Sequence, residues 1–86
     1  MGEGARRAGR VGMHIQIVMD RTGDTRHNFD PGSSAEVMDA QRRFRQLTGE
    51  GFRAVALGRD GEPGKLLRDF DSTVEKTLFI PPLQGG

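Results

Sequence analysis

The first regular pattern in the chain is in the segment HIQIVM, where polar and apolar side chains alternate from His14 to Ile17. A period of two is typical of a β-strand, and it places Ile15, Ile17 and Met19 on one face and the intervening residues on the other. The sequence RTGD predicts a turn, and residues 25–29 are expected to return as a second strand. We therefore predict a β-hairpin, which ends where DPG at residues 30–32 interrupts the ladder.

The period then lengthens to that of a helix. Ser33 and Glu36 predict a capping box, in which the Ser33 hydroxyl accepts a backbone bond at the helix start and Glu36 reaches back to the cap. Gly49 and Gly51 are expected to end the helix, because glycine takes positive φ at little cost. The apolar positions between these ends are spaced by three and four residues and share one stripe: Val37, Ala40, Phe44 and Leu47.

The remaining apolar segments predict further strands. Residues 52–57 read as a third strand, and residues 77–80 read as the last one, with a glycine-rich turn at 59–64 between them. Leu66, Leu67 and Phe70 are expected to anchor a shorter strand or turn. The order is β-β-α-β-(β)-β, and the economical packing for it is an α+β fold with a mixed sheet of four or five strands on one helix. The first and last strands are expected side by side in the sheet centre.

Composition limits the chain to one small domain. Its 86 residues are 34% hydrophobic, which suffices for a single core. The absence of cysteine excludes disulfides, thiolate metal sites and a cysteine nucleophile. With no apolar run of about 20 residues and no secretory leader, we expect a soluble, cytoplasmic protein without membrane contact. A net charge of +1 is too balanced to steer the whole molecule to nucleic acid.

The domain boundaries follow from changes in composition. Residues 1–12 are rich in glycine and arginine and lack apolar periodicity, so we interpret them as a disordered arm. Met13 is a candidate start of the domain, which is expected to span residues 13–80. Residues 81–86 form a separate tail.

Other candidate sites carry little chemistry. The arginines at 42, 43, 45 and 53 favour a solvated helix face over a nucleic-acid patch, because the chain lacks Tyr and Trp for base stacking. His14 and His27 have no nearby cluster of acidic residues, which favours surface histidines over a metal site. No pair of carboxylates can be placed at catalytic separation. We therefore do not expect an enzyme.

The tail PPLQGG is the most unusual feature of the chain. Pro81 and Pro82 fix φ and remove two N–H donors, so the tail is expected to leave the sheet as an extended rod. Six residues at about 3.3 Å each reach roughly 20 Å. Gly85 and Gly86 lack Cβ, which lets the backbone enter a narrow channel.

Residues 13–86 resemble ubiquitin-like β-grasp proteins. The resemblance rests on the opening MHIQIV with its TGDT turn, the helix preceded by DPGSS, the final strand in STVEKTLFI and the terminal diglycine. The closing EKTLFIPPLQGG is also similar to the small subunit of molybdopterin synthase and to archaeal modifiers built on the same fold. Gln84 stands where ubiquitin carries a basic residue, which argues against recognition by the eukaryotic enzymes.

The resemblance implies a protein modifier that is a substrate of other enzymes. An E1-like enzyme would use ATP to adenylate Gly86, and an E2-like carrier would pass the chain to target proteins, with a deubiquitinase-like protease among the partners. The activated end would be Gly85–Gly86, and the partners would recognise the tail through Pro81, Pro82, Leu83 and Gln84. Lys65 and Lys76 are the two lysines that could accept a second copy. Related modifiers occur in bacterial conjugation operons, some of them used against phage.

Two alternatives share parts of this interpretation. In a sulfur carrier, Gly86 would become a thiocarboxylate that delivers sulfur to a cofactor precursor or a transfer RNA base. In a non-covalent docking domain, partners would bind an apolar sheet surface, for which Val18, Val55 and Leu57 are candidate outward positions. A docking domain has no need of the diglycine.

Overall fold

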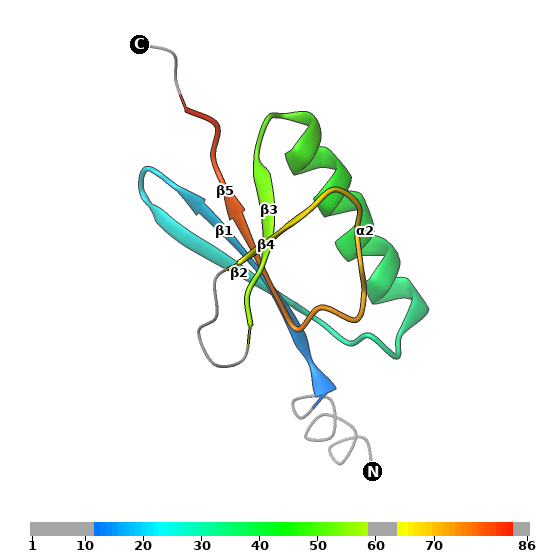
Figure 1. Ribbon diagram of the computed structural model, residues 1–86. Helices are drawn as coiled ribbons and strands as arrows, with labels where there is room; N and C mark the ends of the chain where they lie inside the picture. Colours follow the sequence, from blue (N-terminus) through cyan, green and yellow to red (C-terminus); the bar gives the residue numbers. More distant parts are fainter. Residues whose placement is uncertain (1–11, 59–63, 84–86) are drawn as a thin grey trace.

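The computed structural model describes residues 12–58 and 64–83, and in these residues one helix packs against a five-stranded sheet (Figure 1). The α+β prediction is therefore confirmed. Most of the predicted arm, most of the glycine-rich turn and the end of the tail lie outside the described residues. In chain order the elements are β1 (His14–Asp20), β2 (Gly23–Phe29), α2 (Ser34–Gly49), β3 (Arg53–Ala56), β4 (Lys65–Leu67) and β5 (Lys76–Ile80).

The strand order is β2-β1-β5-β3-β4, which places β5 in the middle of the sheet. β5 pairs in parallel with β1, and Ile17 lies opposite Leu78 in that register. Its other neighbour, β3, is antiparallel and brings Val55 opposite the same Leu78. The prediction that the first and last strands are central neighbours is confirmed.

Local side-chain bonds fix the start of the helix. The Ser33 hydroxyl accepts a bond from the Glu36 N–H at 3.3 Å, as the capping box predicts. The Glu36 carboxylate, however, accepts from the Asp30 N–H at 2.8 Å and does not reach the Ser33 N–H, which donates to the Asp30 carbonyl at 2.9 Å. The Asp30 turn folds back over the helix start, so this half of the predicted box is wrong.

Phenylalanine rings form the centre of the domain. The Phe44 and Phe79 rings meet edge to face at 5.7 Å, and Phe70 lies 6.0 Å from both Phe44 and Phe29. Edge-to-face pairs at such spacings add to the stabilisation gained from burial. The fully buried apolar residues come from four elements: Phe29, Ala40, Phe44, Ala54 and Phe79.

A buried amide on β1 joins the sheet to the helix. Gln16 is 1% exposed, and its Nε2 donates to the Ala40 carbonyl at 3.1 Å. Its Oε1 accepts from Arg43 Nη1 at 2.7 Å, so both ends of the amide are satisfied. The helix-facing side of β1 therefore carries Gln16 and, two residues on, Val18, which packs against the core. The predicted outward position of Val18 is wrong for this reason.

A contact with the first residue of β1 holds the segment between β4 and β5. His14 Nδ1 lies 2.8 Å from the Ser72 carbonyl, and the His14 ring packs edge-on against Phe29 at 5.6 Å. His14 is half-buried, so the prediction of a surface histidine is wrong at this position. His27 is also partly covered; desolvation, followed by the charge of Arg43, lowers its pKa below 6.5.

The turn at Asp71 leads to a prediction about its pKa. The carboxylate accepts bonds from the Thr73 hydroxyl at 2.6 Å and the Thr73 N–H at 2.9 Å, and these bonds, the hydroxyl first, lower the pKa of Asp71 below 3.8. A lowered folded-state pKa stabilises the fold above the unfolded-state pKa, and this is lost as the pH falls through the folded-state value. Thr73→Val is expected to raise the pKa of Asp71, measured by NMR titration of its carboxyl carbon.

Asp20 provides the control within the same molecule. Its carboxylate makes the equivalent pair of bonds to Thr22, both at 2.8 Å, and its pKa is lowered for the same reason. The titration of Asp20 should be the same in both proteins. An unchanged Asp71 titration in the variant would show that the hydroxyl bond is not the cause.

Candidate functional site

The sheet has an apolar face that points away from α2, which we call the outer face. Its central row crosses four strands, because Ile17 lies opposite Leu78, Leu78 opposite Val55, and Val55 opposite Leu66. Side chains alternate along each strand, so residues two positions away join the same face. The outer face comprises Ile15, Ile17, Met19, Val55, Leu57, Leu66, Leu78 and Ile80.

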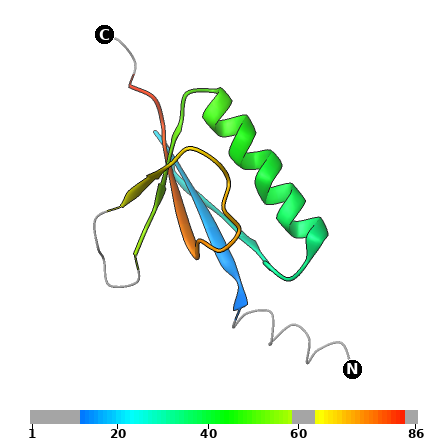
Figure 2. The same cartoon turned by 45° about the vertical axis from the view of Figure 1, so that its right-hand side comes forward.

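No helix of the described chain crosses this face (Figure 2), and the backbone of Gly64 lies against Val55. The helix and the segment from 68 to 75 lie on the opposite side of the sheet (Figure 2). Leu66, Met19 and Ile80 are 57%, 41% and 39% exposed, and the other outer-face residues are partly exposed. Charged residues from three strands form its rim: Asp24, Arg26, Arg53 and Lys76. A contiguous apolar surface with a charged rim is typical of a protein-binding site.

The predicted patch residues divide between the two faces. Val55 and Leu57 lie on the outer face as expected, and the Leu57 N–H continues the ladder by donating to the Lys76 carbonyl at 3.0 Å. Val18 lies on the other face. Residue-level reasoning missed Leu66 and Leu78 as members of the patch, because only the cross-strand register shows that they share its central row.

The tail begins at the end of β5. Pro81 and Pro82 are half-buried, whereas Leu83 is 95% exposed, so the chain leaves the body of the domain after Pro82. All six tail residues were predicted to project from the domain. The first two remain in contact with it, so the projecting part begins two residues later than predicted. Gln84, Gly85 and Gly86 lie outside the described residues.

Both candidate acceptor lysines are accessible. Lys65 and Lys76 are exposed and occupy the first positions of β4 and β5. Neither fold nor burial separates them as acceptors.

The arginines considered for nucleic acid do not form one patch. Arg43 is directed at the buried Gln16, and Arg42 is paired with Asp39 at 3.1 Å. Arg53 lies opposite Ile80 at the rim of the outer face, on the other side of the sheet from the helix. The expectation of a solvated helix face holds for Arg42 and Arg45, which are exposed.

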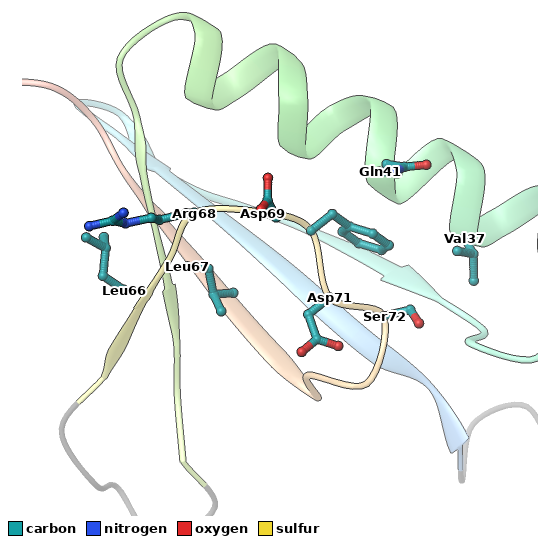
Figure 3. A pocket seen from close by; sticks show the side chains of 9 residues that line it. Val37, Gln41, Leu66, Leu67, Arg68, Asp69, Asp71 and Ser72 are labelled. Atoms are coloured by element: carbon teal, nitrogen blue, oxygen red, sulfur yellow. The ribbon is translucent and has the colours of Figure 1, made fainter.

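A hollow lies between α2 and the segment after β4 (Figure 3). Two adjoining cavities of about 610 and 390 Å³ share Gln41, Arg68, Asp69 and Phe70. Val37 and Gln41 form the helix wall, and Leu66 and Leu67 leave β4 in opposite directions, so that only Leu67 turns toward the core. The weak pattern of this part of the sequence gave no indication of the hollow.

Chemistry within the described residues is limited. In residues 12–58 and 64–83, no three His, Cys, Asp or Glu side chains lie close enough to hold a metal ion. No helix in that part of the chain is long and apolar enough to cross a membrane.

Comparisons with known proteins leave the family open. Family models, curated proteins and solved structures contain no match to this chain.

Proposed function

We propose that this chain is a ubiquitin-like protein modifier of the β-grasp class, with Gly86 carrying the carboxyl group that is activated and conjugated. The order of the elements, with one helix on a mixed sheet and the last strand in its middle, is compatible with that class. An E1-like enzyme, an E2-like carrier and a deubiquitinase-like protease would act on it, and target proteins would receive it.

One observation carries the proposal: the strand that contributes Leu78 and Ile80 to the outer face runs directly into the tail. Leu78 and Ile80 contribute to the outer face, and β5 runs directly into Pro81 and Pro82, after which Leu83 is exposed. A partner that binds the outer face therefore has the tail at a fixed distance from its contact surface. Once the partner has bound the outer face, its active site and the tail are parts of one complex, so the tail reaches the active site in an effectively intramolecular step.

The tail residues suit acyl activation by a partner. A carboxylate oxygen of Gly86 would attack the α-phosphate of ATP, forming an acyl adenylate and releasing pyrophosphate. A partner thiolate would then displace AMP to give a thioester, and a target amine would displace that thiol to give an amide. Without Cβ atoms, Gly85 and Gly86 leave the carbonyl open to each nucleophile.

Mass spectrometry of the protein from its native host tests the conjugation. Lys76 is the last tryptic site, so conjugation to lysine leaves the branch TLFIPPLQGG on a target peptide. We expect this branch after denaturing purification of a tagged chain, and its loss in a variant that lacks Gly86. Intact mass in the same sample reads the mature carboxyl end directly.

The other outcomes would replace the proposal. Free protein with one terminal oxygen exchanged for sulfur, and no branched peptides, would make the chain a sulfur carrier. Neither product, with partners retained by the variant without Gly86, would leave a docking domain that acts through the outer face.

A further inference from the structure

The turn between α2 and β3 contacts the tail. Gly51 has a φ of 101°, and a Cβ built on it would lie 3.2 Å from Pro82 Cβ and 3.3 Å from Pro82 Cγ. The Pro82 ring therefore rests on the bare backbone of Gly51. This is the last burial in the described chain, because Leu83 is 95% exposed.

The surface under Pro82 is a rigid one. The Gly51 N–H donates to the Thr48 carbonyl at 3.1 Å, and the Phe52 N–H donates to the Leu47 carbonyl at 3.0 Å. These two bonds, with glycine at positive φ between them, form a Schellman motif. Leu47 and Phe52 both pack against the core, so the motif is anchored from below.

Pro82 transmits this rigidity to the residues after it. Its ring fixes its own φ, and its presence restricts Pro81 to extended conformations. With the ring seated on Gly51, few backbone torsions remain free before Leu83. The direction in which the chain leaves the domain is thus set by a contact with a turn that is remote in sequence.

We propose that Gly51 and Pro82 are positioning residues that aim the tail. This rests on the proposed function, because an aimed tail matters to an enzyme that must receive it. A partner enzyme would meet a preorganised chain end and would not have to order it on binding, which lowers the entropic cost of association. Glycine suits position 51 because of its φ, and any other side chain would press its Cβ against Pro82 at 3.2 Å, tighter than ordinary van der Waals contact.

NMR relaxation at Leu83 tests the contact without any partner enzyme. In the native protein the Leu83 N–H is expected to have an order parameter above about 0.6, the limit below which backbone is flexible. Gly51→Ala and Pro82→Ala should each lower it below that limit, the first by displacing the ring and the second by removing it. A flexible Leu83 in the native protein, or an ordered one in both variants, would overturn the proposal.

Gly23→Ala is the matched control for strain. Gly23 also has a positive φ, 139°, but an added Cβ meets nothing within 4 Å. Both glycine variants should lose stability from the strained backbone, yet only Gly51→Ala should change Leu83. Pro82→Ala, in the tail, keeps the experiment decisive if Gly51→Ala does not fold.

Activation kinetics separate this proposal from the proposed function. With the E1-like enzyme of the same organism, Gly51→Ala is expected to raise KM about two- to tenfold at unchanged kcat relative to Gly23→Ala, since it alters the ordering of the tail and leaves in place the Pro82 side chain that the partner is expected to contact. If the variants lower the order parameter of Leu83 but the enzyme does not activate the native chain, the positioning role stands and the proposal of a protein modifier is rejected. An altered Leu83 with unchanged KM would reject positioning as a functional device.

Discussion

Phe79→Ala is expected to lower the free energy of unfolding by about 3–5 kcal/mol, the usual loss for a buried phenylalanine. Phe79 is 0% exposed and lies on the central strand, where its ring meets Phe44. Natural domains are stable by only about 5–15 kcal/mol, and small ones lie toward the lower end. The variant should therefore be partly unfolded under mild conditions, as measured by urea denaturation followed by circular dichroism.

Ile80→Ala is the control for this change on the same strand. Ile80 follows Phe79 directly but lies on the outer face and is 39% exposed. Ile80→Ala should lower the free energy of unfolding by at most about half as much as Phe79→Ala, because less apolar surface returns to water. Equal losses for the two variants would contradict the assignment of the two sheet faces.

Leu66→Glu is expected to weaken binding of the proposed activating enzyme about 30-fold or more, because the interface would bury an unpaired carboxylate against an apolar surface. Leu66 ends the apolar row of the outer face and is 57% exposed, so the carboxylate should not disturb the fold. Binding would be measured by isothermal titration calorimetry with the E1-like enzyme of the same organism.

Met38→Glu provides a change of the same kind elsewhere on the surface. Met38 is 59% exposed on α2, which covers the opposite side of the sheet. The Met38→Glu variant should equal the native protein within error in its affinity for the E1-like enzyme and in its stability. Equal losses of affinity from Leu66→Glu and Met38→Glu would mean that the outer face is not the docking surface.

Local signals account for the parts of the fold that the sequence predicted well. The helix was predictable because its cap at Ser33 and the stripe through Phe44 depend on residues within a few turns of one another. The hairpin was predictable for the same reason. β4 was uncertain because its three residues form a strand only through pairing with β3, such as Leu66 with Val55.

The assignment of sheet faces needed information that is not local. Alternation along β1 correctly separates Ile15 and Ile17 from Gln16, but a period of two does not say which set is inward. Gln16 can be buried because Ala40 and Arg43 satisfy its amide, and both lie on a different element. An interpretation that takes every glutamine as solvent-facing therefore places Val18, which shares the face of Gln16, on the outer face of the sheet.

The candidate site was predictable in its chemistry but not in its geometry. The sequence alone identified the tail, because two prolines and a diglycine are local features. It could not show that Pro82 rests on Gly51, since the two residues come together only when the last strand enters the sheet.

The central place of β5 also has a consequence for how the protein is made. Its partner β1 is the first strand of the domain. Ile15 and Lys76 pair in the sheet although nearly the whole domain lies between them in the sequence. Such distant pairing slows folding, because a long loop has to close before the contact can form. A growing chain on the ribosome would thus lack its middle strand until Ile80 had emerged. The sheet would therefore be complete only after residues 76–80 had joined it.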